Sequence, residues 1–256
     1  MKLLAFIMII YLTLGCMTDT DQYVTSKINT DSQSLSYLDR AIRILPLGDS
    51  RVEGSRPNYE SYRYELWKLF MENEWHVDFV GPLVDESNYP SFMNTPFDTD
   101  HAGVGGFTSE DILLNISEAL SAIESPDIVL LGIGGNDLLA NTEVDTVIEQ
   151  ITEVIDILHN HNPHVTIFLE QIAPGNQQLM TAEFEVLLNT FHRALKDLAS
   201  SHHASIVLVD MYTDWQENYL ADEVHYNELG AQMIAERYYQ ALSDHFDPMT
   251  TEEDCL

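Results

Sequence analysis

The sequence predicts an α/β domain in which a parallel sheet is covered by helices on both faces. Two observations lead to this fold class. Short apolar runs alternate along the chain with longer segments that carry apolar residues at helical spacing. One of the runs, Asp127–Ile133, is apolar almost throughout, as is typical of a strand buried in a parallel sheet. Strands that alternate with helices form such sheets, because each parallel strand is reached through a crossover connection.

The expected strands are apolar runs that stop at turn residues. The first run ends at Gly48, the second at Gly81-Pro82 and the third at Gly134-Gly135, since glycine and proline interrupt regular structure. The five runs cover residues 42–47, 76–80, 127–133, 165–169 and 206–209.

The expected helices carry an apolar face. The segment Thr108–Asp111 is a typical helix start, and Ile112, Ile116 and Leu120 follow it at helical spacing. Between the second strand and this helix, residues 83–100 are expected to form a long loop, and loops of this length are usually functional or mobile. The five expected helices cover residues 59–71, 108–120, 143–159, 181–200 and 227–242.

The composition of the chain is strongly acidic. Eleven lysine and arginine residues stand against 42 aspartate and glutamate residues, which gives the 256 residues a formal charge of −31. A field of this sign repels phosphate groups, so we expect no nucleic-acid partner. It also disfavours docking on anionic lipid through a basic patch. The hydrophobic content of 45% is ordinary for a globular protein, and the length suits one domain, expected at residues 42–246.

The amino terminus is typical of an export signal. Lys2 precedes the uncharged apolar run Leu3–Leu14, which is too short to span a bilayer as a stable helix. The Gly15-Cys16 pair at its end resembles a bacterial lipoprotein processing site, at which the cysteine receives a lipid. We therefore expect a signal peptide at residues 1–16 and an exported protein. A membrane-anchored lipoprotein is the first expectation, and a periplasmic or secreted protein is the alternative.

Both cysteines lie outside the expected core. They are Cys16 and Cys255, so no disulfide framework and no thiolate metal site is expected. If Cys16 carries a lipid, Cys255 is a lone thiol; a bridge between the two is the alternative. Residues 17–41 are polar and are expected to form a flexible linker, and residues 247–256 an acidic tail.

Polar residues that can take part in catalysis follow two of the expected strands. Asp49-Ser50 comes after the first strand and Asn136-Asp137 after the third. Because the carboxyl ends of parallel strands meet at one edge of a sheet, we expect Ser50 and Asn136 to lie close together. Taken alone, Ser50 is more simply explained as a helix cap, and an asparagine after two glycines as a turn residue.

A possible base for Ser50 stands near the end of the chain. Asp222 precedes His225 by three residues, a spacing at which the carboxylate can bond the ring Nδ1–H and leave Nε2 free as a base. A serine needs such a base to become a nucleophile. The backbone N–H groups of Ser50 and Gly106 and the side-chain amide of Asn136 can supply an oxyanion hole.

Taken together and in this order, these motifs resemble the SGNH hydrolases, also called the GDSL family. Gly48-Asp49-Ser50 resembles the first sequence block of that family. Gly106 resembles the second-block glycine, Asn136 the third-block asparagine, and Asp222 with His225 the fifth block. The resemblance covers roughly residues 43–242. It implies a flavodoxin-like αβα sandwich with a five-stranded parallel sheet, Ser50 as nucleophile, and esterase, lipase, thioesterase or carbohydrate deacetylase activity.

Within that family, three segments are similar to the acetylxylan-esterase-like branch. They are residues 44–50, 77–81 and 101–108. This similarity implies a serine esterase that removes short acyl groups, above all acetyl groups, from carbohydrate through a Ser-His-Asp triad and an acyl-enzyme, without a metal or other cofactor. The substrate partner would be a small-molecule or glycan ester. The alternatives are a lipase, lysophospholipase or thioesterase, and a non-catalytic glycan-binding surface protein with the same fold.

Four further residues are candidate substrate contacts: Asp49, Arg51, Phe107 and Trp215. Arg51 stands where the family commonly has leucine or isoleucine, and it can belong to a charged rim that favours a polar or anionic ligand; a solvated surface cluster is the alternative. Phe107 and Trp215 can line the acyl or sugar pocket, or belong to the core. Asp49 and Asp137 are better suited to holding loops than to reacting.

Three histidines gather near the end of an expected helix. They are His159, His161 and His164, and a metal site there is conceivable. Their position at the helix end favours a cationic cap instead.

Overall fold

The computed structural model describes residues 40–201 and 205–246. The expected signal peptide, the acidic tail and all but the last two residues of the expected linker lie outside the described residues. The expected domain at residues 42–246 falls almost wholly within them.

The sheet of the described residues has seven strands, with β1 (Ile42–Gly48) near its middle. All five expected strands form and pair in parallel in the order β2-β1-β5-β6-β7, which is the flavodoxin-like order. The α/β fold class and the parallel sheet are therefore confirmed. The other four strands of this set are β2 (Val77–Phe79), β5 (Ile128–Gly132), β6 (Thr166–Gln171) and β7 (Ile206–Asp210).

Two strands of the sheet were not expected from the sequence. β3 (Leu83–Val84) and β4 (Asp100–Gly103) lie at the two ends of the segment predicted to be a loop. β4 pairs in parallel with the end of β1, and β3 pairs with β4 in an antiparallel manner. The sequence of β4 is Asp-His-Ala-Gly, which has no apolar run, so its strand structure depends on the partner β1 rather than on its own residues.

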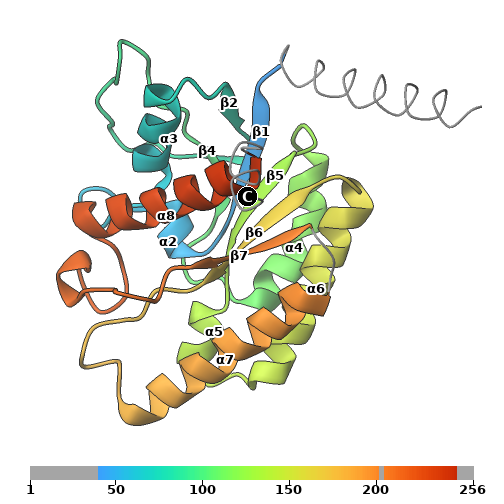
Figure 1. Ribbon diagram of the computed structural model, residues 1–256, viewed down its shortest axis with the longest axis vertical. Helices are drawn as coiled ribbons and strands as arrows, with labels where there is room; N and C mark the ends of the chain where they lie inside the picture. Colours follow the sequence, from blue (N-terminus) through green and yellow to red (C-terminus); the bar gives the residue numbers. More distant parts are fainter. Residues whose placement is uncertain (1–39, 202–204, 247–256) are drawn as a thin grey trace, which may run out of the picture. The chain divides into compact units, whose positions relative to one another are not determined.

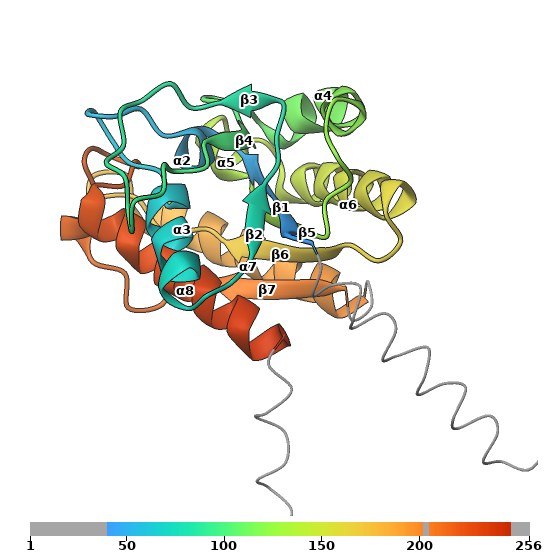
Figure 2. The ribbon, with the colours of Figure 1, turned by 90° about the horizontal axis from the view of Figure 1, so that it is seen from above.

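Helices cover both faces of the sheet (Figure 1). Three helices pack on one face, where they share a hydrophobic cluster with Leu45 and Leu47 of β1; α3 and α8 pack on the other face with Ile44 (Figure 2). The first set is α4 (Ser109–Ser121), α6 (Val144–His161) and α7 (Ala182–Ser201). The second set is α3 (Arg63–Glu72) and α8 (Glu228–Phe246). The three-layer αβα arrangement follows.

The helix expected from residue 59 begins four residues later. The backbone N–H of Glu60 donates to the carbonyl oxygen of Tyr226 at 2.8 Å, and Tyr59 pairs with Ser55 in a tight turn. These bonds to other segments take the backbone of residues 59–60 out of the helical path. α3 therefore starts at Arg63, and the turn before it packs against the segment that carries His225.

Arg63 ties the long segment after β2 to the short helix α2 (Ser50–Glu53). Its side chain is fully buried and donates to the carbonyl oxygens of Val52 and Glu53 at 2.8 Å each. It also forms an ion pair of 2.8 Å with Asp85. A buried charge must be paired and hydrogen-bonded, so this arginine fixes the long segment against the end of α2.

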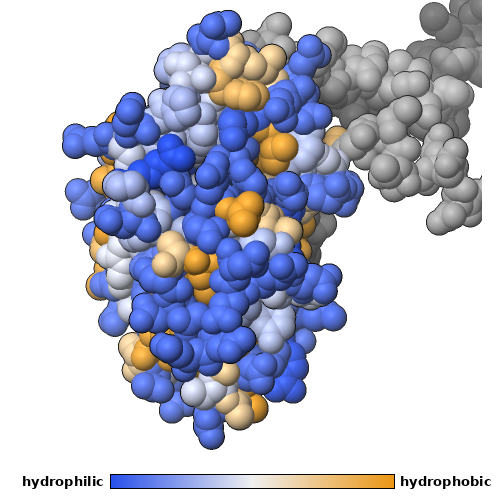
Figure 3. Space-filling view, turned by 90° about the vertical axis from the view of Figure 1, so that its left-hand side faces the viewer, coloured by the Kyte–Doolittle hydropathy of each residue, from blue (hydrophilic) through white to orange (hydrophobic). Residues whose placement is uncertain are grey.

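The surface of the described domain is largely hydrophilic on the side shown in Figure 3, where hydrophobic residues form small separate patches. Within residues 40–201 and 205–246, no helix is long and apolar enough to cross a bilayer.

Candidate active site

Ser50 lies at the carboxyl end of the central strand, where β1 passes into α2. Asp49 caps this helix by accepting a hydrogen bond of 2.9 Å from the backbone N–H of Arg51. Gly48 is required by close packing, because a Cβ at this position would lie 2.2 Å from the carbonyl oxygen of Gly132 on β5. The Gly-Asp-Ser sequence thus lets two neighbouring strands approach closely and presents the serine at the edge of the sheet.

The structure brings Ser50, His225 and Asp222 into one hydrogen-bonded row. The Ser50 Oγ lies 2.9 Å from His225 Nε2, although the two residues are 175 positions apart. The His225 Nδ1 lies 2.7 Å from Asp222 Oδ2. With the ring proton on Nδ1, Nε2 faces the serine as an acceptor, as a general base requires.

The Asp222 carboxylate is held by its own loop. Its Oδ1 accepts hydrogen bonds from the backbone N–H groups of Val224 and His225, at 2.9 and 2.8 Å. Desolvation raises the pKa of Asp222, but the bonds from His225 and Val224 outweigh it and keep the pKa below its ordinary value. Asp222 therefore stays ionised and keeps accepting the bond from the imidazole.

Gly106 lies on the loop after β4 and Asn136 in the short helix that follows β5, at the same edge of the sheet. Gly106 has φ +81°, a left-handed conformation that favours glycine. Asn136 is in the short helix α5 (Gly135–Leu139), and its Nδ2 donates to the carbonyl oxygen of Phe107 at 2.9 Å. A Cβ built on Gly105 would lie 3.8 Å from that of Ser50, so the glycine loop runs alongside the serine.

Asp137 and Asp49 hold backbone segments. The buried Asp137 accepts hydrogen bonds from both the N–H and the hydroxyl of Ser109, which ties the start of α4 to α5. Burial raises the pKa of Asp49, and the neighbouring Arg51 partly offsets this. Asp49 is 7% exposed, and its Oδ1 is engaged by the backbone N–H of Arg51.

Arg51 is engaged with backbone carbonyl groups. Its Nε donates to the carbonyl oxygen of Val224 at 2.9 Å, and its Nη1 to that of Ala173 at 2.7 Å. The guanidinium also lies 5.1 Å from the ring centre of Tyr226. The side chain thus joins the serine turn to the loop that carries His225, an arrangement that differs from both expectations, the charged rim and the solvated cluster.

The two aromatic candidates lie away from the small pocket beside Ser50. Trp215 packs against Tyr219 and Tyr226, with ring centres 5.2 and 5.5 Å apart. The Phe107 side chain lines a separate groove, although its carbonyl oxygen contacts Asn136.

Two contacts near the serine were not predicted from the sequence. The ring of Tyr59 is stacked on the imidazole of His225, and the Glu53 carboxylate accepts a hydrogen bond from the backbone N–H of Gly105. Neither contact has a signal in the sequence, since each joins segments that only the tertiary fold brings together.

A small pocket of about 40 Å³ adjoins Ser50 and Asn136. Its walls come from α5, from the loop after β6 and from the start of α7. Apart from Ser50, Asn136 and the neighbouring polar groups, its lining is apolar: Leu139, Ile172, Ala173, Pro174, Leu179, Phe184, Leu188 and Val224.

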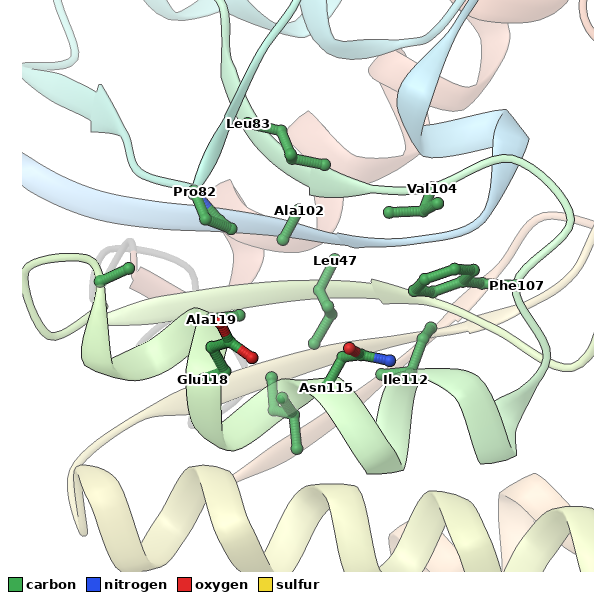
Figure 4. Close-up of a pocket in the computed structure, with 12 residues that line it drawn as sticks. Leu47, Pro82, Leu83, Ala102, Val104, Phe107, Ile112, Asn115, Glu118 and Ala119 are labelled. Atoms are coloured by element: carbon green, nitrogen blue, oxygen red, sulfur yellow. The ribbon is translucent and has the colours of Figure 1, made fainter.

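A larger apolar groove of about 260 Å³ runs between α4 and the β3–β4 edge (Figure 4). Phe107 stands near one end of it, and Pro82 near the other. Among residues 40–201 and 205–246, no group of three or more histidine, cysteine, aspartate or glutamate side chains is arranged to hold a metal ion.

The fold and this arrangement of side chains are typical of the class of carboxylic ester hydrolases. The chain belongs to the GDSL-like Lipase/Acylhydrolase family, whose model matches residues 47–233. The expected family membership is therefore confirmed.

The chain is similar in sequence or in structure to three esterases. A multidomain esterase of Ruminococcus flavefaciens is 26% identical over 227 residues, which are 81% of this chain and 29% of that protein, so this chain spans less than a third of its length. An acetyl esterase mutant crystallised with an acetate ion superposes with a TM-score of 0.68 at 25% identity, over 79% of this chain and 97% of that one. A family 3 carbohydrate esterase of Clostridium thermocellum gives a TM-score of 0.63 at 28% identity, over 80% and 96% of the two chains.

Proposed function

We propose that this chain hydrolyses short acyl esters, and that its substrates are acetylated carbohydrates. The observation that carries the proposal is the row of hydrogen bonds from Ser50 through His225 to Asp222, with distances of 2.9 and 2.7 Å. An activated nucleophile, a base and a group that orients the base stand in this order in hydrolases that act through an acyl-enzyme.

In the proposed reaction, the Ser50 Oγ attacks the ester carbonyl carbon while its proton passes to His225 Nε2. The tetrahedral intermediate collapses when His225 gives this proton to the oxygen of the leaving alcohol. Water then attacks the acyl-enzyme, His225 takes a proton from the water, and collapse of the second intermediate releases the acid and returns the proton to Ser50. Asp222 stays ionised throughout and stabilises the imidazolium.

The oxyanion of each intermediate is proposed to lie among three donors: the backbone N–H groups of Ser50 and Gly106 and the amide of Asn136. The Asn136 Nδ2 carries two hydrogens, of which one bonds the carbonyl oxygen of Phe107. The second hydrogen is then available for the oxyanion. Donors held in place before the reaction stabilise the developing charge without reorganising.

The pocket beside Ser50 supports a short acyl group. A cavity needs about 10–15 Å³ for each water-sized group, so the volume of about 40 Å³ suits an acetyl group, which has three non-hydrogen atoms. Leu179, Phe184 and Leu188 line this pocket and leave no volume for a long chain. The alcohol part of the ester would extend the other way, past His225.

The similarity to the acetyl esterase supports acetyl as the acyl group, and the similarity to the family 3 carbohydrate esterase supports carbohydrate as the alcohol part. The hydrophilic surface in Figure 3 also suits a water-soluble substrate better than a lipid interface.

A long-chain acyl hydrolase is the second candidate, because the apolar groove along α4 begins at Phe107, next to Gly106 (Figure 4). Its volume of about 260 Å³ is large enough for a fatty acyl chain. In that case the acyl chain would pass Phe107 instead of entering the small pocket.

Hydrolysis of p-nitrophenyl esters from acetate to octanoate separates these functions. We expect kcat/KM to be highest for acetate, to fall with chain length and to vanish in Ser50→Ala, and we expect acetate release from acetylated xylan. A maximum at octanoate would favour the long-chain candidate. Turnover that persists in Ser50→Ala would contradict Ser50 as the nucleophile. Undetectable turnover on every ester would contradict an esterase and favour a glycan-binding protein.

A further inference from the structure

The base of the proposed triad and the carboxylate that orients it are both partly exposed to solvent. The side chain of Asp222 is 42% exposed and that of His225 is 21% exposed. Water competes for hydrogen bonds at such positions, which weakens the hold of the carboxylate on the imidazole. A second contact can therefore add to the orientation of the imidazole toward Ser50.

Tyr59 supplies this contact. Its ring and the imidazole of His225 have centres 3.9 Å apart and planes that differ by 15°, so the two rings are stacked. Stacking on a flat surface restricts the rotation of an imidazole about its Cβ–Cγ bond. It leaves both ring nitrogens free in the ring plane, where Ser50 and Asp222 lie. An aromatic face also attracts the imidazolium that forms during the reaction.

The backbone aligns the two rings independently of the stacking. Glu60, which follows Tyr59, donates its N–H to the carbonyl oxygen of Tyr226, which follows His225, at 2.8 Å. This isolated antiparallel bridge sets the two segments in register. The turn is closed by the hydrogen bonds between Ser55 and Tyr59, at 3.1 and 3.3 Å.

The same turn is anchored on its outer side. Arg56 forms an ion pair with Glu60, and its guanidinium lies 4.5 Å from the ring centre of Tyr89 and 5.5 Å from that of Tyr64. The turn is thus held from the long segment after β2 as well as from the histidine loop, and the Tyr59 ring is set in place before substrate binds.

We infer that Tyr59 is a positioning residue, which acts through His225 by holding its imidazole in the plane that faces Ser50. The inference rests on the proposed function of the triad. It deepens that function by naming what orients the base where the carboxylate is exposed.

The test compares Tyr59→Leu, which removes the ring, with Tyr59→Phe, which keeps it, on p-nitrophenyl acetate. Misplacing a catalytic group by about 1 Å costs up to roughly 10²-fold in rate. We expect kcat of Tyr59→Leu to fall by roughly 10- to 100-fold with KM within about twofold of wild type, and kcat of Tyr59→Phe to stay within about twofold. Tyr239→Leu is the control, because Tyr239 packs against Phe70 and Trp75, roughly 16 Å along α8 from its start. It should lower the unfolding temperature without lowering kcat.

A double-mutant cycle with His225→Ala distinguishes positioning from substrate contact. If Tyr59 acts through His225, Tyr59→Leu should change the residual turnover of His225→Ala by less than about twofold, since residues that act as a unit are not additive. Equal losses in both backgrounds, or full activity of Tyr59→Leu beside an active wild type, would overturn the inference. Absence of Ser50-dependent turnover in the wild type would instead refute the proposed function.

Discussion

The carboxylate of Glu53 accepts a hydrogen bond of 2.7 Å from the backbone N–H of Gly105. Glu53 is the last residue of α2, the helix that begins at Ser50, so one short element presents the serine and also fixes the loop that carries Gly106. The amide of Asn136 holds the other side of that loop through the carbonyl oxygen of Phe107. The position of the Gly106 N–H therefore depends on two side chains.

We predict that Glu53→Ala lowers kcat by roughly tenfold on p-nitrophenyl acetate. Loss of a whole oxyanion donor costs about 10²- to 10³-fold, and here the Gly106 N–H is displaced rather than removed. Glu53→Gln keeps an acceptor oxygen and should retain most of the activity. Glu236→Gln, which removes an exposed carboxylate on α8, controls for the change in charge. An unaltered kcat in Glu53→Ala would show that the loop keeps its place without this bond.

Arg51 is predicted to contribute to both stability and turnover. Arg51→Met leaves the carbonyl oxygens of Val224 and Ala173 without a donor, which should lower the free energy of unfolding by about 1–3 kcal/mol. The loop next to His225 loses a support, so kcat should fall as well. Urea unfolding and kinetics measure the two effects, with Arg193→Met on the exposed face of α7 as control. Unchanged stability with a raised KM for anionic esters would instead assign Arg51 to substrate binding.

Glu170 should make the stability of the domain depend on pH. It is 3% exposed, and burial raises its pKa to about 7, although the hydroxyl of Tyr238 donates to it at 2.6 Å. Between pH 4.5, the ordinary pKa of the unfolded chain, and about pH 7, the folded protein keeps a proton that the unfolded chain has lost. The stability that this group contributes is full below pH 4.5 and is lost as the pH rises to about 7, to an extent of up to about 3 kcal/mol.

Glu170→Gln cannot ionise and lacks this dependence. We expect urea unfolding to show that the variant gains stability relative to wild type between pH 5 and pH 8. Asp98→Asn serves as comparison, because burial raises the pKa of Asp98 to about 6 and its effect should be complete at a lower pH. A constant difference between Glu170→Gln and wild type across this range would refute an ionisation of Glu170 near neutral pH.

The size of the acyl group is predicted to depend on the pocket beside Ser50. Leu179→Ala enlarges this pocket and should raise the ratio of kcat/KM for butanoate to that for acetate by roughly tenfold, since one methylene in an apolar pocket is worth about 10- to 200-fold. Leu83→Ala, in the groove along α4, is the matched control and should leave the ratio unchanged. A raised ratio in Leu83→Ala with an unchanged ratio in Leu179→Ala would place the acyl chain in the groove along α4.

Much of the fold could be predicted because apolar runs in parallel strands are visible in the sequence. The run from Asp127 to Ile133 contains all of β5, and the helix start expected at Thr108–Asp111 does begin α4, with a capping box. β4 carries no such run. Its strand structure depends on its pairing with β1, so the sequence alone could not predict it.

The candidate site, like the fold, could be predicted from the sequence only in part. Ser50 and Asn136 could be placed together because parallel strands bring their carboxyl ends to one edge. The partners of Arg51 are backbone carbonyl groups 122 and 173 positions away, and the sequence holds no signal for bonds of that kind. The stacking of Tyr59 on His225 was missed for a related reason, since the residues around Tyr59 have helical spacing but pair with the histidine loop instead.

The most direct test of the proposed chemistry is covalent labelling of the nucleophile with diisopropyl fluorophosphate, located by peptide mass spectrometry. We expect one adduct per chain on Ser50, no adduct in Ser50→Ala, and labelling of His225→Ala slowed by at least about 10²-fold, because the serine hydroxyl reacts only when a base takes its proton. An adduct on another residue, or equal labelling rates with and without His225, would contradict Ser50 as a nucleophile activated by His225.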